Sequence, residues 1–207
     1  MREFASYEGM DASVKNALRV SLLEEQGHLC AYCMSRIEFE HQGVKIDHYK
    51  PRSKYPELQL EYENLLAVCD GREGEKRSRQ TCDTRKGDES ELVINPLSPL
   101  ITKQLNYGND GSIKSDDPCV RHDINDILNL NDPSGFLITN RKSVLDRFKK
   151  EFDDVVNKRK KYTAETYLKR VRGTLLKPRQ GVLDPYIGIV VWYVDKKLGQ
   201  YNRNTRE

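Results

Sequence analysis

Three stretches of the chain carry apolar residues at helical spacing. Between residues 12 and 26 the apolar side chains recur every three or four positions, which predicts an amphipathic helix that Gly27 can end. The same spacing returns over residues 135–162, and we expect a further helix at 164–176. Residues 187–198 are ambiguous, because their β-branched side chains favour a strand while their spacing also permits a helix.

The part of the chain between the first two helices is more polar and richer in turn residues. Residues 32–37 and 43–46 have the character of two short strands joined by a turn that contains glycine. Short helices are expected at 62–68 and 81–86. The whole pattern predicts an α+β fold in three regions: an N-terminal helix within 1–28, a small core at 29–90 and a mainly α-helical region at 91–207.

Composition narrows the class of protein. The 207 residues include 35 Lys and Arg and 32 Asp and Glu, so the net charge is only +3 and any binding to nucleic acid must come from local basic patches. A hydrophobic fraction of 37% is enough for a folded core. No apolar run approaches the ~18 residues of a membrane span. Residues 1–11 do not resemble an export signal, so we expect a cytoplasmic protein.

Four of the five cysteines lie close together in the sequence. Cys30 and Cys33 form a C-x2-C pair, and Cys69 and Cys82 follow it. Because thiols stay reduced in the cytoplasm, such a cluster indicates a metal site before it indicates disulfides. Four thiolates can close a tetrahedral structural zinc site, a zinc knuckle, whose binding energy would help to order a segment with few apolar residues. The alternative is four unrelated buried thiols, and Cys119 receives no role.

An aspartate and a histidine directly follow the second expected strand. The carboxylate of Asp47 is a hard oxygen ligand that suits Mg²⁺, and the imidazole of His48 titrates near neutrality and can take a proton from water. Closure of the zinc site would bring Asp83 close to this pair, and Asn64 could hydrogen-bond the loop that holds His48. The alternative is that Asp47 and His48 are solvated loop residues.

Taken together, these residues resemble the HNH endonuclease family. The matching elements are Cys30-x2-Cys33, Ile46-Asp47-His48-Tyr49-x-Pro51, Asn64-Leu65-Leu66, Cys69 and Cys82-Asp83-x2-Lys86-Gly87. The resemblance implies a small ββα-metal core that a four-cysteine zinc holds together. It implies that Asp47 binds a catalytic Mg²⁺ or Mn²⁺, that His48 is the general base, and that Asn64 stabilises the His48 loop. Asp83 stands where the family has a metal-binding His or Asn.

A narrower resemblance is to the PtuB nucleases of Septu-type and retron-associated anti-phage systems. It rests on residues 50–56, 80–88, 94–97 and 127–131 in addition to the HNH motifs. It implies a PtuA-type ATPase as partner and, in retron systems, also a reverse transcriptase with its small DNA (msDNA). It further implies that residues 185–198 are helical and that the region after residue 90 binds the partner.

Basic residues near the Asp47-His48 pair are candidate contacts to a nucleic-acid substrate, which could be DNA or RNA. We expect these contacts from Lys50, Arg52 and Lys54, and from Arg85 and Lys86. The basic run at 158–161 is instead typical of a solvated helix end. Two other functions stay open: a non-catalytic zinc-ribbon module that binds nucleic acid, and a subunit that regulates the ATPase.

Overall fold

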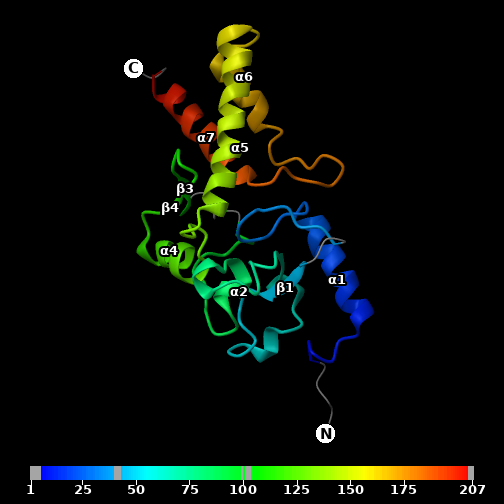
Figure 1. Ribbon diagram of the computed structural model, residues 1–207. Helices are drawn as coiled ribbons and strands as arrows, with labels where there is room; N and C mark the ends of the chain where they lie inside the picture. Colours follow the sequence, from blue (N-terminus) through cyan, green and yellow to red (C-terminus); the bar gives the residue numbers. More distant parts are fainter. Residues whose placement is uncertain (1–5, 40–42, 99, 101–103, 205–207) are drawn as a thin grey trace.

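The computed structural model describes residues 6–39, 43–98, 100 and 104–204 (Figure 1). Its α-helices are α1 (Ala12–Glu25), α2 (Cys82–Lys86), α4 (Pro118–His122), α5 (Phe136–Asp153), α6 (Ala164–Arg172) and α7 (Ile187–Asn204). Its strands are β1 (Lys45–His48), β2 (Leu65–Val68), β3 (Asn106–Tyr107) and β4 (Ile113–Lys114). Short 3-10 helices are η1 (Pro56–Leu58), η2 (Tyr62–Asn64) and η3 (Arg77–Arg79), and π-helical turns are η4 (Asp123–Ile127) and η5 (Asp154–Lys158). The fold is therefore α+β with small sheets and many helices.

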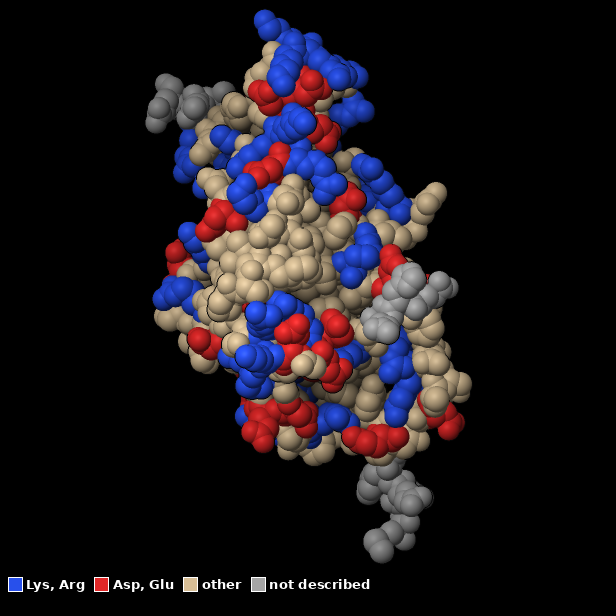
Figure 2. Space-filling model, in the orientation of Figure 1, with Lys and Arg blue, Asp and Glu red and all other residues tan. Residues whose placement is uncertain are grey.

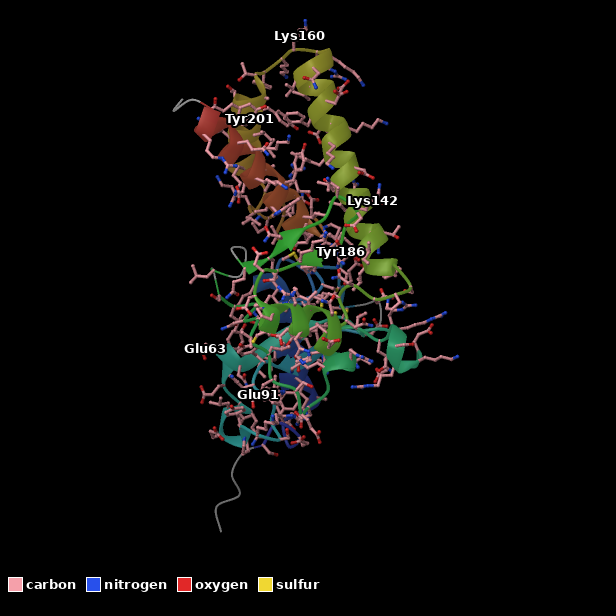
Figure 3. All side chains as sticks on the ribbon, turned by 90° about the vertical axis from the view of Figure 1, so that its left-hand side faces the viewer. Glu63, Glu91, Lys142, Lys160, Tyr186 and Tyr201 are labelled. Atoms are coloured by element: carbon pink, nitrogen blue, oxygen red, sulfur yellow. The ribbon has the colours of Figure 1, made fainter. Side chains whose placement is uncertain are left out.

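The elements form two parts that differ in architecture. One part contains α1, the β1–β2 hairpin, α2 and α4 (Figure 1). From it projects a helical arm, by which we mean α5, α6, α7 and the segments that connect them. Lys160 lies at the far end of the arm, and Glu91 lies in the opposite part of the molecule (Figure 3). The division into regions 1–28, 29–90 and 91–207 stays a prediction.

The β1–β2 hairpin corrects one prediction. Residues 62–68, expected to be a helix, form η2 followed by β2, which pairs antiparallel with β1 so that His48 lies opposite Leu65. All four residues of β2 are buried, and a short apolar run of this kind does not reveal its structure by periodicity. The other edge of β2 is completed by Gln26, whose side chain exchanges two hydrogen bonds with the backbone of Ala67 (2.7 and 2.8 Å).

The strand expected at residues 32–37 is also wrong. The backbone of Cys30 accepts a hydrogen bond from Met34 N (3.0 Å) and donates one to Ser35 O (2.9 Å), so the chain reverses here instead of extending. Met34 takes a left-handed conformation (φ 60°) at the reversal, and only an isolated bridge joins Leu29 to Arg36. The turn is what allows both cysteines of the C-x2-C pair to point to one place.

The helix α1 and the helices of the arm match the apolar pattern closely. Residues 12–26, 135–162 and 164–176 were expected to be helical, and α1, α5 with η5, and α6 lie within these ranges. The ambiguous segment 187–198 is helical as part of α7, which packs against α5 and α6 through buried Leu145, Leu168 and Val194. Among the described residues, no helix is long and apolar enough to cross a membrane.

Candidate active site

Four cysteines from three separate segments of the chain meet at one place in the fold. Cys30 and Cys33 come from the reversal after α1, Cys69 directly follows β2, and Cys82 begins α2. Their Sγ atoms all lie within 4.8 Å of one another, with 3.9 Å between Cys30 and Cys82 and 3.8 Å between Cys33 and Cys69. A tetrahedral zinc site with Zn–S bonds of about 2.3 Å separates its sulfur atoms by about 3.8 Å. The four thiols therefore fit a structural zinc ion.

The environment of the cluster also favours a bound cation. Burial raises the pKa of the Cys30 thiol well above its usual range, so four thiolates do not coexist here without a compensating charge. Among the described residues, this is the only group of His, Cys, Asp or Glu side chains with such convergent ligand atoms. Cys119, in contrast, is exposed and free.

Next to the cluster, two acidic side chains and one imidazole line a single open cleft. Asp47 and His48 come from β1, and Asp83 comes from α2 one residue after Cys82. All three line a cleft of about 320 Å³. The cysteine cluster thus fixes the start of α2 against the hairpin, and this places Asp83 opposite Asp47. Burial and the neighbouring Asp47 carboxylate raise the pKa of Asp83 to about 7.

The carboxylate of Asp47 is held by two buried donors. The hydroxyl of Tyr32, a residue inside the C-x2-C pair, donates to Asp47 Oδ2 at 2.5 Å. Lys86 Nζ lies 2.9 Å from both oxygens of Asp47 and also donates to the backbone oxygen of His48 at 2.8 Å. The Lys86 side chain is only 1% exposed. Its burial does not fit the substrate contact that the sequence led us to expect, because a phosphate outside the protein does not reach this ammonium.

The imidazole of His48 is oriented by a backbone carbonyl. Nε2 lies 2.9 Å from the oxygen of Gln59, and because a carbonyl only accepts hydrogen bonds, Nε2 must carry the proton. Nδ1 is then the ring nitrogen with a lone pair. Burial lowers the pKa of His48 from its ordinary value, although the bond to Gln59 partly opposes this, so the ring is neutral near pH 7.

Tyr7 packs against the His48 ring from the N-terminal segment. The two rings meet edge to face, with centroids 4.8 Å apart and an interplanar angle of 87°. The backbone nitrogen of Tyr7 donates to the side chain of Gln59 at 3.0 Å, so Gln59 holds both rings. Neither Tyr7 nor Gln59 stands in a recognisable motif, so no local pattern marks either residue as part of the site. Tyr32 was missed as well, although its place between two cysteines could have marked it.

Asn64 lies at the base of this arrangement and is buried. Its side chain accepts from Lys50 N (2.7 Å) and donates to Lys50 O and Leu58 O (both 3.1 Å). It therefore ties the segment that follows His48 to the turn that ends at Gln59. This geometry is consistent with the role that the sequence analysis expected for Asn64.

The remaining basic residues that were expected to contact the substrate differ in whether they line the cleft. Arg52 lines it and forms an ion pair with Glu8. Lys50 and Lys54 instead pair with Glu91, at 3.7 and 3.2 Å. Arg85 is half-buried on α2 and donates to the backbone oxygens of Arg77 and Asp126. Of these four cations, Arg52 is the one that lines the cleft together with the carboxylates and the imidazole.

Comparison with known proteins agrees with the motifs. No protein-family model matches the chain. The chain is similar to the Septu protein PtuB of Bacillus thuringiensis, with 33% identity over 96 residues, which covers 45% of this chain and 35% of that protein. It is also similar to the "Retron Vc95 putative HNH endonuclease" of Vibrio cholerae serotype O1 biovar El Tor, with 33% identity over 103 residues, 48% of this chain and 47% of that protein.

Both matches confirm the resemblance of this chain to PtuB-like HNH nucleases. The chain spans less than half of the length of either relative that it matches.

Proposed function

We propose that this protein is a metal-dependent HNH-type endonuclease that hydrolyses phosphodiester bonds in DNA or RNA. The observation that carries the proposal is the convergence of Asp47, His48 and Asp83 on one cleft, with a lone pair left on His48 Nδ1. The β1–β2 hairpin and α2, pinned by the four cysteines, would form the ββα-metal core of that family, with zinc in a structural role.

His48 would act as the general base. Nδ1 takes a proton from a water molecule as the water attacks the phosphorus atom in line with the leaving oxygen. The carbonyl of Gln59 keeps the other proton on Nε2 and stabilises the imidazolium that forms. A positioned general base typically accelerates such a reaction by about 10²–10⁴-fold.

The two carboxylates fit a catalytic divalent cation. Mg²⁺ in phosphoryl-transfer sites is commonly bound by one or two carboxylates together with substrate phosphates and water. Asp47 and Asp83 supply two such carboxylates, and the pKa of Asp83 is raised by burial and by repulsion from Asp47, which a cation would relieve. When bound, Mg²⁺ or Mn²⁺ supplies polarisation of the phosphate and stabilisation of the leaving oxygen. Tyr32 and Lys86 would hold Asp47 in position.

The basic residues around the cleft would position the substrate. Arg52 lines the cleft and forms an ion pair with Glu8. On substrate binding it would release Glu8 and contact the phosphate next to the scissile bond instead. Lys50, Lys54 and Arg85 would contact flanking phosphates. Lys86 is left out of this set because its ammonium is buried against Asp47.

We further propose that the protein is the effector subunit of an anti-phage defence complex in the cytoplasm. The support comes from the names of the two relatives, a Septu protein PtuB and a retron-associated protein. The partner would be a PtuA-type ATPase and, in a retron context, also a reverse transcriptase with its msDNA. Partner binding would involve the region after residue 90.

Cleavage assays with matched histidine variants test the proposal. Labelled single-stranded DNA, duplex DNA and RNA are each incubated with Mg²⁺, with Mn²⁺ or with neither, in the presence and absence of the ATPase. His48→Ala should lose at least about 100-fold in rate. His122→Ala is the control, because His122 is exposed and pairs with Asp126 far along the chain from the cleft.

Equal cleavage by wild type and His48→Ala would falsify the catalytic assignment. A wild-type protein that binds nucleic acid but never cleaves it would favour the zinc-ribbon binding module. A protein that changes only the ATPase rate would favour a regulatory subunit. Neither alternative explains why Asp47 and Asp83 line one cleft, because two carboxylates repel a phosphate unless a cation lies between them.

A further inference from the structure

The charges of this protein are separated along the chain. Residues 1–135 contain 17 Lys and Arg against 24 Asp and Glu, a net charge of −7, whereas residues 136–207 contain 18 against 8, a net charge of +10. The boundary falls where α5 begins, so the helical arm carries the positive charge and the part with the cleft carries the negative charge. Figure 2 shows Lys and Arg outnumbering Asp and Glu over the arm.

Most carboxylates of the arm are already neutralised by a neighbouring base. Five of them have a Lys or Arg nitrogen close by, in the pairs Lys142–Asp146, Lys158–Asp153, Arg159–Asp154, Lys169–Glu165 and Arg172–Asp195. The cations outside these pairs form the surplus that gives the arm its charge.

Part of this surplus gathers around two adjoining hollows. They lie between α5, α6 and the segment 173–186, and have volumes of about 360 and 560 Å³. Lys177 and Arg179 line both hollows, Arg147 lines the first, and Lys161 and Arg170 line the second. The carboxylates that line them are Glu151, which accepts a hydrogen bond from Tyr167 at 2.9 Å, and Asp184. Five cations therefore face two carboxylates.

An aromatic ring lies among these cations. Lys161 and Arg170 lie 5.7 and 5.5 Å from the centre of the Tyr162 ring, and Arg170 also donates to its hydroxyl at 2.7 Å. Tyr167 lies beside it, with ring centroids 6.5 Å apart, but Tyr167 is buried, so Tyr162 is the ring of this pair that a base could reach. Proteins that bind single-stranded nucleic acid combine such a cationic groove, which follows the phosphates, with aromatic rings against which bases stack.

The cleft by itself is poorly suited to attract a polyanion. Its lining includes four acidic side chains and two basic ones, in a part of the chain with a net charge of −7. Phosphate contacts by Lys and Arg supply most of the affinity of proteins for nucleic acid. If a nucleic acid is the substrate, a surface beyond the few cations proposed around the cleft would add to that affinity, and the hollows of the arm have the required charge.

We propose that the face of the arm around the two hollows binds the phosphate backbone of a single nucleic-acid strand, a neighbouring stretch of which reaches the cleft. The binding residues are Arg147, Lys161, Arg170, Lys177 and Arg179. The choice of a nucleic acid over an acidic protein rests on the proposed nuclease function. The surface itself follows from the charges and the hollows.

The test measures binding of the full-length, zinc-loaded protein without added Mg²⁺ or Mn²⁺, so that no cleavage intervenes. A fluorescein-labelled single strand of about 30 nucleotides is titrated by anisotropy at several salt concentrations between about 50 and about 200 mM. A plot of log K against log[salt] has a slope that changes by about 0.7 for each phosphate contact to a single strand. The variant Lys161→Gln/Lys177→Gln/Arg179→Gln loses three such contacts, so its slope should be shallower by about 2. Its affinity at the lowest salt should fall at least about tenfold.

The matched control removes three charges from the same arm outside the hollows. Lys150→Gln/Lys196→Gln/Lys197→Gln changes the net charge equally, and these lysines line neither hollow among the described residues. Its affinity should change less than about threefold. Circular dichroism of both variants checks that the helices remain folded.

Equal losses in the two variants would mean that only net charge matters and would overturn the proposal. The proposal would also be overturned if Lys161→Gln/Lys177→Gln/Arg179→Gln bound the strand as tightly as wild type. The same holds if this variant lost only self-association or ATPase binding and kept its affinity for the strand. The nuclease function fails separately: arm-dependent binding by a wild-type protein that never cleaves with Mg²⁺ or Mn²⁺ would uphold the arm surface and remove the enzyme.

Discussion

The buried ion pair between Lys86 and Asp47 gives a quantitative test of how the cleft is built. The two side chains are 1% and 7% exposed, and the ammonium lies 2.9 Å from both carboxylate oxygens. Lys86→Met keeps most of the side-chain volume and removes the charge. Asp47 then remains buried beside Asp83 without its cation, although the hydroxyl of Tyr32 still donates to it.

The expected loss of stability is large. Removing one partner of a buried pair costs about 3–5 kcal/mol, because the remaining charge is left uncompensated. With a urea m-value of about 2 kcal/mol/M, the unfolding midpoint of Lys86→Met should fall by roughly 1.5–2.5 M. Added Mg²⁺ should recover part of this loss, because a cation that binds only the folded state stabilises it.

Lys45, which lines the cleft, provides the control. Lys45 pairs with Glu73 at 3.1 Å, but these side chains are 28% and 67% exposed. Exposed pairs contribute only about 0.2–1 kcal/mol, so Lys45→Met should shift the midpoint by at most about 0.5 M. If both variants shift equally, or if Lys86→Met unfolds like wild type, the ammonium does not hold Asp47 and our account of the cleft is wrong.

Three further changes test other parts of the site. Cys69→Ser should lose bound zinc in a metal assay and unfold at lower urea, whereas Cys119→Ser should retain one zinc per chain; zinc retained equally by both would refute the cluster. Asn64→Ala leaves three half-buried backbone groups without their partner and should cost about 1–3 kcal/mol in urea unfolding together with slower cleavage; an unchanged midpoint would contradict this. The pKa of Asp83 is raised to about 7, so this carboxyl binds its proton more tightly in the folded state and its contribution to stability is lost as pH rises from about 4 to about 7. Asp83→Asn should remove that loss, and its urea midpoint should exceed that of wild type by more at pH 7.5 than at pH 5; a constant difference would refute the assignment.

Local patterns predicted three of the helices and marked the four cysteines as one candidate metal set. The apolar spacing in α1, α5 and α6 predicted those helices because a helix buries one face, and burying one face requires that period. The thiols were recognisable as a candidate metal set because a C-x2-C pair followed by two more cysteines is typical of metal sites.

The same patterns did not identify β2. Four buried apolar residues lack a period that separates strand from helix, and the decision came from distant partners. β1 supplies hydrogen bonds on one edge of β2, and the side chain of Gln26 supplies them on the other.

The amino-acid sequence alone determined which residue types this protein has for chemistry: four thiols, two acids and an imidazole at spacings typical of a metal-dependent nuclease. The tertiary structure alone decided what each charge faces. It buried Lys86 against Asp47 rather than exposing it, and it placed the Tyr7 ring and the Gln59 carbonyl on His48. It also gathered the surplus cations of the arm around two hollows. The physical reason is that the energy of a charge depends on its burial and on its nearest partners, and those partners come from segments far apart in the chain.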